Sequence, residues 1–494
     1  MSVNHEDVVD WVKSCQEKLK YAFRDDFDSL LLIESFVTQY EIRAKALLYK
    51  SRIDLLKEKI SSTKQTIISS LKILSGNSRN FSPLNVPPEI CIDKEPIDLF
   101  FWPFQESHLQ MISELYQNLS KRMEVLAGTT NPPILGKFDL YNLDKCFDFE
   151  VENIPRNDYR NDLRAIRILE FSKQIEGFSK EGKTIKFEDV LKDAWRLWYG
   201  LFDQSKVAFY YLLRSLNPKG IFIGNDITLV GAVVVRLAQK NGIITYSIMH
   251  GSIKNPLWQY SKVDYFFVFG PLDRDLMINR GIAPQKLIVS GSPKLEKFLV
   301  EGKNTFDSFE IILVALSGPG HSVSLPHHLS ILKVFENLAR EMPEEKFVFK
   351  LHKKDKKKYY RKLKGFENVI VIEYDDKSKN QNIYYWIKKS KAVISGVSTS
   401  LLEAMYFKRP AISIDLLGEL QKEIIVSTEI TLNVNNYDEL VSCIRQINAN
   451  SYKITSHLEQ STKYIENVYS NSSNGSLKLI SEKIFTSINE GITD

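Results

Sequence analysis

The sequence predicts an α/β protein with two Rossmann-like, doubly wound domains and an N-terminal helical extension. Short buried strands alternate with helices from residue 97 to residue 301, and the alternation restarts at residue 311 after a polar stretch, 301–308. Strands that alternate with helices indicate parallel sheets covered by helices. The length of 494 residues is enough for about three domains, which agrees with an extension and two halves.

Composition and charge exclude several classes of protein. The 43% hydrophobic and 26% charged fractions are ordinary for a globular protein and exclude a disordered or fibrous chain. A net charge of +5 gives no reason to expect nucleic acid as a partner. The four cysteines lie far apart, which argues against a zinc ribbon or a disulfide framework and favours a reducing compartment.

The start of the chain is polar and lacks the pattern of a signal peptide. No apolar run approaches the roughly 20 residues of a membrane-spanning helix. We therefore expect a cytoplasmic protein, and peripheral contact with the inner face of a membrane stays open.

The extension, residues 1–85, has apolar residues at helical spacing from residue 6 to about residue 76. A break at Arg24-Asp25-Asp26 predicts a helical hairpin. Such an amphipathic stripe packs against the body of its own protein, a partner helix or a second copy of the chain.

The first Rossmann-like domain is expected at residues 86–303, and the resemblance described below implies that it is the acceptor domain. Strands are expected at 97–102, 123–127, 221–223, 243–248, 265–269 and 287–289. Helices are expected at 108–119, 160–180, 187–216 and 229–241.

The second domain is expected at residues 304–494 and closes with a helical tail; the resemblance described below implies that it is the nucleotide-donor domain. Strands are expected at 311–316, 347–351, 369–372, 392–394 and 411–414. Helices are expected at 325–340, 381–390 and 399–407, and in the tail at 436–447 and 455–490.

Candidate residues in the first domain follow two of its strands, because ligands of doubly wound sheets bind at the carboxyl ends of strands. Asn225 and Asp226 follow strand 221–223, where such side chains also cap helices. His250, Gly251 and Ser252 follow strand 243–248. A histidine there suits a general base or a phosphate donor, and the alternative is a histidine satisfied by nearby backbone.

Candidate residues in the second domain also follow strands. Ser317 and Gly318 begin a glycine-rich turn before a helix, where phosphate or sugar can approach backbone N–H groups. The turn matches neither the P-loop nor the dinucleotide fingerprint. His352 follows strand 347–351.

A cluster of hydroxyl groups precedes the helix expected at 399–407. Ser398, Thr399 and Ser400 offer hydroxyls and free N–H groups for an anion. Ser400 with Glu403 also has the spacing of a capping box, so helix initiation explains part of the pattern.

The positive charge of the chain is concentrated between Lys346 and Lys364, where ten Lys and Arg residues face one acidic residue, Asp355. An anionic membrane surface, a phosphate-rich ligand and a solvated helix face are the alternatives. The histidines at 321, 327 and 328 lack metal-site spacing, so no metal and no cofactor are expected.

Residues 220–415 resemble GT-B glycosyltransferases that build bacterial surface polysaccharides. The motifs that carry the resemblance are Asn225-Asp226, Met249-His250-Gly251, Gly291-Ser292-Pro293-Lys294, Lys350-Leu351-His352 and the stretch from Ser398 to Pro410. His352 with Ser398–Ser400 is similar to the paired motifs of CMP-sugar users (sialyl- and Kdo-type transferases) and of CDP-glycerol polymerases. Lys353 stands where those motifs have proline.

The resemblance implies a metal-independent GT-B glycosyltransferase with a nucleotide-sugar donor and a glycan or lipid-linked acceptor. It implies catalysis by His250 and Asp226, with Asn225, Gly251 and Ser252 on the acceptor side. The donor site it implies comprises Ser317, Gly318, His352, Ser398, Thr399, Ser400 and Glu403, in which Glu403 holds the ribose. Hydroxyls, N–H groups and a histidine would stabilise the departing phosphate.

Three other functions stay open: a CDP-glycerol or polyol phosphotransferase, an enzyme similar to UDP-GlcNAc 2-epimerases, and a non-catalytic GT-B scaffold. The epimerase requires additional carboxylates, and the sequence shows no clear set of them.

Overall fold

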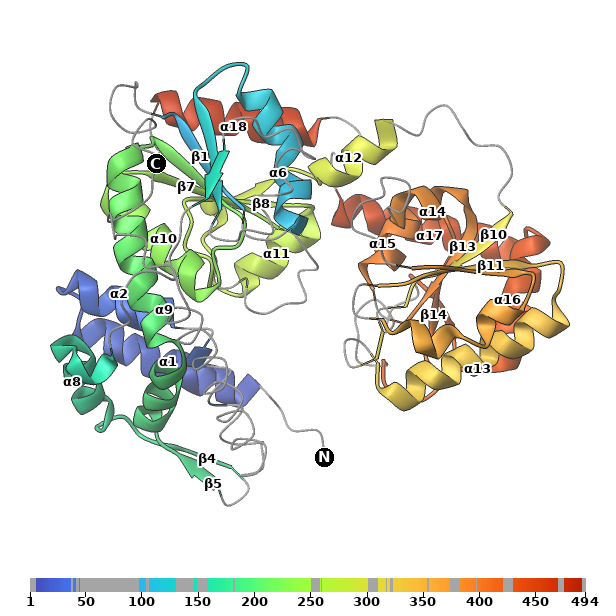
Figure 1. The fold of residues 1–494 in the computed structure, drawn as a ribbon, viewed down its shortest axis with the longest axis horizontal. Coiled ribbons are helices and arrows are strands. Elements are labelled where there is room, and N and C mark those ends of the chain that lie inside the picture. The colour runs from blue at the N-terminus through green and yellow to red at the C-terminus, as the bar shows by residue number, and fades with distance from the viewer. Residues whose placement is uncertain are drawn as a thin grey trace, which may run out of the picture. The chain divides into compact units, whose positions relative to one another are not determined.

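The computed structural model divides the chain into two compact units (Figure 1). The first comprises Met1–Phe267, Leu276–Ile288 and Lys478–Asp494, and the second comprises Val268–Asp275 and Val289–Leu477. The structure describes residues 6–36, 39–40, 44, 97–103, 106–129, 146–148, 158–180, 183–249, 258, 260–300, 310–316, 318–319, 323–352, 355–373, 383–396, 398–420, 430–469 and 475–490.

The first unit contains a seven-stranded sheet in the order β3-β2-β1-β6-β7-β8-β9. Its strands are β1 (Leu99–Trp102), β2 (Val125–Thr129), β3 (Cys146–Asp148), β6 (Gly220–Ile223), β7 (Ile244–Ile248), β8 (Tyr265–Val268) and β9 (Leu287–Val289). The paired strands from β3 to β8 are parallel. Strands β1 and β6 are buried throughout, as their continuous apolar sequences require.

Helices cover this sheet. They are α6 (Glu106–Leu119), α9 (Phe187–Leu216), α10 (Leu229–Lys240), α11 (Pro271–Asn279) and the C-terminal α18 (Ser476–Glu490). Helix α8 (Leu163–Ser172) packs against α9 and the N-terminal helices instead. Helix α9 ends where Asn217 adopts a left-handed conformation, with φ 44°. On its buried face, the ring of Phe209 packs 4.7 Å from that of Trp102.

Helix α18 comes from the far end of the chain and packs on the first sheet. Ile480 and Ile484 are fully buried. The hydroxyls of Ser487 and Tyr246 lie 2.6 Å apart, and Arg122 forms an ion pair of 2.7 Å with Glu482. The last helix therefore completes the first unit.

The N-terminal extension forms helices α1 (Glu6–Ala22) and α2 (Phe27–Ser35), with the predicted break between them. Asp26 caps α2 by accepting a hydrogen bond from the backbone N–H of Ser29. Tyr40, just beyond α2, accepts a hydrogen bond of 3.0 Å from Trp195 of α9. The described part of the extension thus packs against the body of its own unit, and residues 45–96 lie outside the described residues.

The second unit contains a parallel six-stranded sheet in the order β12-β11-β10-β13-β14-β15. Its strands are β10 (Ile311–Val314), β11 (Lys346–Lys350), β12 (Val369–Ile372), β13 (Ser390–Ser395), β14 (Ala411–Ile414) and β15 (Leu432–Val434). Its helices are α12 (Pro293–Val300), α13 (Leu325–Glu341), α14 (Ile383–Lys389), α15 (Thr399–Tyr406), α16 (Tyr437–Asn448) and α17 (Tyr452–Val468).

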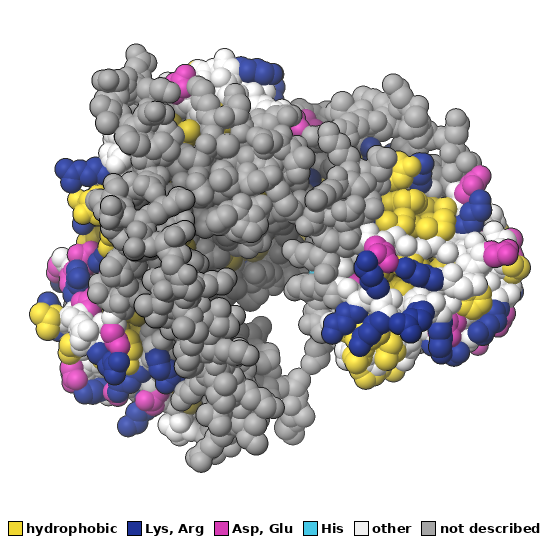
Figure 2. All heavy atoms as spheres, in the orientation of Figure 1, with side chains coloured by type: hydrophobic (Ala, Val, Ile, Leu, Met, Phe, Trp, Pro, Cys, Tyr) yellow, Lys and Arg dark blue, Asp and Glu magenta, His cyan; other side chains and the backbone are white. Residues whose placement is uncertain are grey.

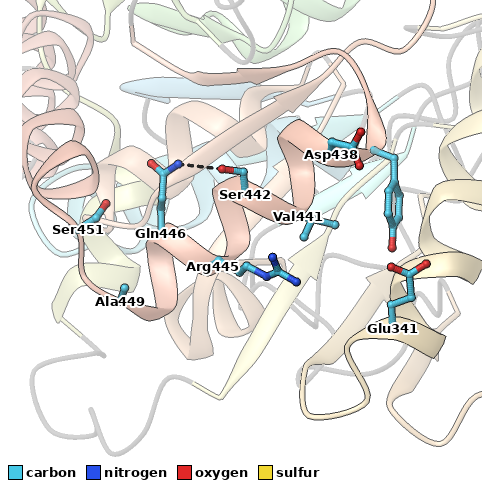
Figure 3. A pocket seen from close by; sticks show the side chains of 9 residues that line it. Glu341, Asp438, Val441, Ser442, Arg445, Gln446, Ala449 and Ser451 are labelled. Atoms are coloured by element: carbon cyan, nitrogen blue, oxygen red, sulfur yellow. Dashed lines mark hydrogen bonds between the residues drawn. The ribbon is translucent and has the colours of Figure 1, made fainter.

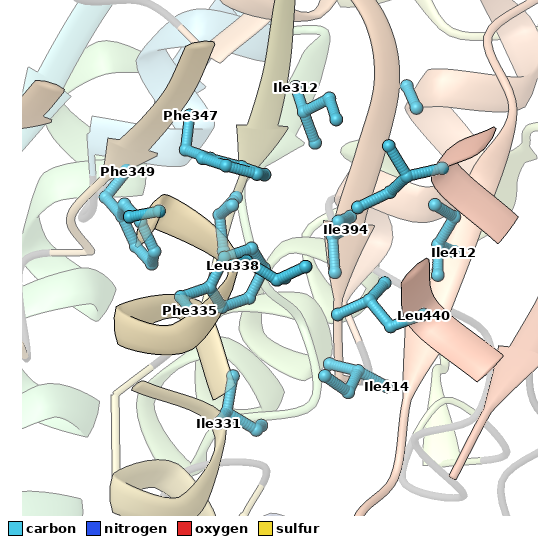
Figure 4. Close-up of a cluster of buried hydrophobic side chains, with 14 of the residues drawn as sticks. Ile312, Ile331, Phe335, Leu338, Phe347, Phe349, Ile394, Ile412, Ile414 and Leu440 are labelled. Carbon is cyan, nitrogen blue, oxygen red and sulfur yellow. The ribbon is translucent and has the colours of Figure 1, made fainter. Parts of the chain in front are cut away.

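Apolar side chains from this sheet and from α13 and α16 form the core of the second unit (Figure 4). Phe335 of α13 is fully buried, and its ring lies 5.5 Å from that of Phe347 and 5.1 Å from that of Phe349. Ile312 and Leu440 lie in the same cluster. The predicted pair of doubly wound, Rossmann-like α/β units is confirmed.

Several predicted elements are wrong in detail. The helix expected at 160–180 ends at Ser172, and β4 (Phe178–Lys180) and β5 (Lys183–Ile185) form a hairpin after it. Gly177 permits this hairpin, because a Cβ there would stand 2.9 Å from the carbonyl oxygen of Ile185. The helix expected at 455–490 divides at Gly475, with φ 108°, into α17 and α18. Within the described residues, no helix is both long and apolar enough to cross a membrane.

Candidate functional site

The candidate site of the second unit lies at the switch point of its sheet. Strands β10 and β13 are neighbours, and the chain continues from β10 to β11 on one side and from β13 to β14 on the other. The loops after β10 and β13 therefore leave the sheet in opposite directions, and ligands of doubly wound sheets bind at such a point of the carboxyl edge. Gly318 and Ser398 lie on these two loops.

The turn after β10 depends on Gly318, whose φ is 75°. A Cβ at this position would stand 3.1 Å from Oδ1 of Asp355, so glycine also allows the turn to approach this carboxylate. A bridge between Pro319 and Val323 follows. Val323 packs with Leu420 from the loop after β14.

Helix α15 begins differently from the prediction. Ser398 is the N-cap, and its hydroxyl accepts a hydrogen bond of 3.2 Å from the backbone N–H of Ser400. The capping box predicted from Ser400 and Glu403 is therefore wrong, because the cap lies two residues earlier. Thr399 is the first residue of the helix.

The side chain of Ser400 stays available as a result. The residue is 4% exposed, and its Oγ has no hydrogen-bond partner within the described part of the chain. A buried hydroxyl without a partner costs about 1–3 kcal/mol. Ser400 and Glu403 are three residues apart and lie on the same face of α15.

The carboxylate of Glu403 is held by a tyrosine from a neighbouring helix. Tyr384 of α14, which is 1% exposed, donates a hydrogen bond of 2.7 Å to Oε1 of Glu403. Burial and the nearby carboxylate raise the pKa of Tyr384 well above its ordinary value, so its hydroxyl stays a donor. Sequence reasoning missed Tyr384.

Lys294 approaches the same pair. Its ammonium lies 5.0 Å from the centre of the Tyr384 ring. Burial lowers the pKa of Lys294, and the negative charge of Glu403 partly offsets this effect. The only earlier indication of this lysine was its place in the motif Gly291-Ser292-Pro293-Lys294.

His352 follows β11 and begins a tight turn, in which its carbonyl accepts a hydrogen bond of 2.8 Å from the N–H of Asp355. The Asp355 side chain is fully buried, with Oδ1 3.7 Å from Nε2 of His328. Tyr360 Oη lies 3.4 Å from the same nitrogen. Burial raises the pKa of Asp355 to about 6 and lowers that of His328 to about 4.

In the first unit, Asn225 and Asp226 follow β6 at the switch point between β1 and β6. Asn225 Oδ1 accepts a hydrogen bond of 3.2 Å from the N–H of Ile227, and its carbonyl accepts one from Thr228, the N-cap of α10. The side chain of Asn225 thus supports the turn, and no acceptor group is needed to explain it.

Asp226 is 2% exposed. Ser261 donates a hydrogen bond to Oδ2, and Oδ1 has no hydrogen-bond partner within the described residues. Burial raises the pKa of Asp226, and the hydrogen bond from Ser261 partly offsets this effect. Asp226 is therefore easier to protonate than an exposed aspartate.

His108 of α6 is a further residue at this switch point that the sequence did not indicate. It is 1% exposed and packs directly against Gly224. A Cβ on Gly224 would stand 2.7 Å from Cγ of His108. Gly224 is therefore required for this close approach.

His327, next to His328, has a structural role. Its Nε2 accepts a hydrogen bond of 3.0 Å from the N–H of Leu416, and its Nδ1 lies 3.3 Å from Oε2 of Glu419. The same carboxylate accepts hydrogen bonds from Ser324, the N-cap of α13. In the described parts of the chain, no group of three or more His, Cys, Asp or Glu side chains is arranged to hold a metal ion.

The basic segment from Lys346 to Lys364 is partly neutralised. Lys346 forms an ion pair with Glu310, and both Lys357 and Lys364 form ion pairs with Glu373. The side chains at 356–358, 361–362 and 364 are exposed. Lys and Arg side chains gather on the visible face of the second unit (Figure 2).

A surface hollow of about 490 Å³ lies elsewhere, between the end of α13 and α16 (Figure 3). Glu341, Tyr437 and Arg445 line it. A helix that follows a parallel strand runs back toward the amino edge of the sheet, so the end of α13 is remote from the carboxyl ends of the strands. The hollow is therefore separate from the candidate site.

Four predicted site residues lie outside the described residues: His250, Gly251, Ser252 and Ser317. Their roles stay predictions. The structure brings together Ser398, Ser400 and Glu403 on the first two turns of α15, and it adds Tyr384 and Lys294 to them.

No known family model matches the sequence, and no curated protein matches it. Solved structures match the fold over most of the chain. The UDP-GlcNAc 2-epimerase from Neisseria meningitidis, bound to UDP-GlcNAc, is 15% identical with a TM-score of 0.52, and the match covers 79% of this chain and 100% of that one.

Two further structures give similar matches. S. aureus MnaA with UDP is 11% identical with a TM-score of 0.51 and coverages of 81% and 98%. The UDP-GlcNAc 2-epimerase from Methanocaldococcus jannaschii is 14% identical with a TM-score of 0.50 and coverages of 80% and 100%. At these identities the similarity establishes the fold.

The expectation of a glycosyltransferase is wrong in the light of these matches. The matched proteins include UDP-GlcNAc 2-epimerases, whereas the sequence motifs favoured a transferase. The short motifs shared with transferases occupy strand ends, and strand ends bind nucleotides in either class.

Proposed function

We propose that this protein binds a UDP-N-acetylhexosamine and inverts the configuration at C2 of its sugar. The observation that carries the proposal is the Glu403 carboxylate, which Tyr384 fixes at 2.7 Å beside the partnerless hydroxyl of Ser400 at the switch point of the second sheet. The structures that share this fold include enzymes bound to UDP-GlcNAc and UDP. Together they favour a nucleotide sugar as the ligand.

The chemistry defines what the residues must do. The proton at C2 becomes removable when the C1–O bond breaks: UDP leaves with the electron pair of that bond, and the C2–H electron pair forms a C1=C2 double bond. Return of a proton to the other face of C2 and of UDP to C1 gives the epimer. The reaction therefore needs a group that accepts and returns a proton, and donors that stabilise the departing diphosphate.

Residues of the second unit suit the binding of the nucleotide. We assign the hydroxyls and N–H groups at the start of α15, from Ser398 to Ser400, to the diphosphate, and Glu403 to hydroxyls of the ribose. The catalytic role that the sequence predicts for Asp226 stays a prediction. No acceptor takes part in an epimerisation, so Asn225 keeps only the structural role described above.

The test combines turnover with binding. Incubation with UDP-GlcNAc in D2O, followed by NMR, is expected to give the C2 epimer with one deuterium at C2. Isothermal titration calorimetry is expected to show binding of UDP. Absence of both UDP binding and deuterium incorporation would overturn the proposal.

The variant Glu403→Gln keeps an oxygen that can accept the hydrogen bond from Tyr384 and removes only the charge. We expect it to weaken UDP binding roughly 10-fold or more, the usual effect of losing a charged hydrogen bond. The matched control is Glu344→Gln, which changes an exposed residue just before β11. Equal affinities for both variants would remove Glu403 from the site.

A further inference from the structure

Lys294 lies on a rigid turn. Strand β9 ends at Val289, and the backbone N–H of Gly291, with φ 76°, donates a hydrogen bond of 3.1 Å to the carbonyl of Phe269. Ser292 and Pro293 are buried, so Lys294, the second residue of α12, is anchored on its N-terminal side. From this anchored start of α12, the side chain of Lys294 reaches the ring of Tyr384 on α14.

The side chain of Lys294 is half-buried, and it forms no ion pair with any carboxylate of the described residues. Its ammonium lies 5.0 Å above the ring of Tyr384, where the negative face of the ring attracts a cation. Among the described residues, no carboxylate lies within 4.0 Å of it. Glu403 attracts it from farther away and already accepts the hydrogen bond of Tyr384.

This arrangement favours an anionic ligand over a structural ion pair. A cation that has lost part of its hydration gains most from a direct anionic partner. The hydroxyl of Tyr384 holds the Glu403 carboxylate, and the ring of Tyr384 contacts the ammonium of Lys294. The site therefore presents an acceptor for hydroxyls and a cation side by side, which matches the hydroxyl and phosphate groups of a nucleotide.

We propose that Lys294 binds the diphosphate of the nucleotide, and that Tyr384 positions both Lys294 and Glu403 for it. This inference rests on the proposed function, because the diphosphate belongs to the nucleotide sugar. It adds a residue and a charge to the site that neither the predicted donor site nor the start of α15 supplies.

Calorimetry with UDP, uridine and inorganic pyrophosphate tests the assignment. The variant Lys294→Gln is expected to weaken binding of UDP and pyrophosphate roughly 10- to 100-fold, because a charged hydrogen bond is lost. Binding of uridine is expected to stay within about twofold, since uridine carries no phosphate. Unchanged affinity for UDP would overturn the inference.

Lys389→Gln is the matched control. Lys389 lies on α14, and its ammonium stands 4.4 Å from the ring of Tyr385, so it is a second lysine in contact with a tyrosine of this helix. It is exposed, and its ammonium also donates a hydrogen bond to the hydroxyl of Tyr385. This variant is expected to bind UDP as the wild type does, and an equal loss in both variants would indicate a general charge effect and overturn the inference.

A second measurement uses the unaltered protein and does not depend on the folding of a variant. Lysine acetylation by acetic anhydride is followed by mass spectrometry, with and without ligand. UDP and pyrophosphate are expected to slow the acetylation of Lys294 at least about 10-fold, in proportion to site occupancy. Uridine is expected to leave the acetylation of Lys294 unchanged, and none of these ligands is expected to change the acetylation of Lys389. Absence of protection by bound UDP would overturn the inference and leave the proposed function standing, whereas failure of UDP to bind the wild type would overturn the proposed function.

Discussion

The buried pair of Asp355 and His328 gives a pH dependence with a defined sign. We expect Asp355→Asn to make the second unit lose stability as the pH falls from 6.5 to 4, over a range in which the wild-type pair has almost no net effect. The two side chains are fully buried and 3.7 Å apart. Solvent screening therefore does not diminish their contributions.

The magnitude follows from the two pKa values. Burial raises the pKa of Asp355 from 3.8 to about 6, so the folded state takes up this proton first and gains about 3 kcal/mol as the pH falls through that range. Burial lowers the pKa of His328 from 6.5 to about 4, so the unfolded state takes up that proton first and the folded state loses about 3 kcal/mol between these values. The contributions have opposite signs and nearly cancel.

Removing the carboxyl leaves only the histidine contribution. Asp355→Asn is therefore expected to lose about 3 kcal/mol relative to the wild type between pH 6.5 and 4, which corresponds to a decrease in Tm of about 6–12 °C. His328→Gln is expected to show the opposite slope and gain stability as the pH falls from 6 to 3.8. Differential scanning calorimetry at stepped pH measures both.

The result that refutes this reasoning is equally clear. If the wild type and Asp355→Asn show parallel dependences of Tm on pH, the pair does not exchange protons as described. The groups that face the pair are Tyr360, 3.4 Å from His328, and His327, the adjacent residue in α13. Asp355→Asn alters neither His327 nor Tyr360, so both groups are the same in the two proteins whose Tm values are compared.

Two further substitutions test the packing of each unit. Phe335→Ala is expected to destabilise the second unit by about 3–5 kcal/mol, because the ring is fully buried against Phe347 and Phe349. Calorimetry should show one shifted unfolding transition, which identifies that unit. The control Tyr385→Ala changes an exposed residue and should shift the transition of neither unit. Gly224→Ala is expected to cost the first unit about 1–3 kcal/mol because its Cβ would stand 2.7 Å from Cγ of His108. Adding His108→Ala to Gly224→Ala should recover part of that loss, and additive effects of the two changes would refute the contact. The control Gly365→Ala places its methyl group with no atom within 4 Å and should change stability by less than about 1 kcal/mol.

The alternation of apolar runs and amphipathic helices was sufficient to predict the fold class. Strands with continuous apolar sequences, such as Phe347–Phe349, can be buried only between layers, and their positions follow from the sequence. Strands β3 and β15 were missed because each of these three-residue strands contains a polar residue, whereas the equally short β9 is wholly apolar. The hairpin at β4 and β5 was missed because its polar, lysine-rich sequence gives no strand signal.

The candidate site was predictable where its residues are contiguous. Ser398, Ser400 and Glu403 lie within six residues of one another on one helix start, so their proximity is local. Lys294 and Tyr384 were not predictable, because 90 residues separate them and only the tertiary fold brings the ammonium to the ring. The mistaken capping box has the same origin: the partner of Glu403 is a hydroxyl on another helix.

The position of α18 has a consequence for how the protein is made. The first unit includes residues near both ends of the chain, and Ile480, Ile484 and the hydroxyl of Ser487 complete its interior. During synthesis, the first sheet emerges from the ribosome long before this helix does, and at 5–20 residues per second, in round terms about ten seconds or more separate Ile248 from Ile480. Until then the apolar surface that α18 covers stays exposed, so the first unit can finish folding only after the second unit has been synthesised. A chaperone that binds nascent apolar surface can act during that interval.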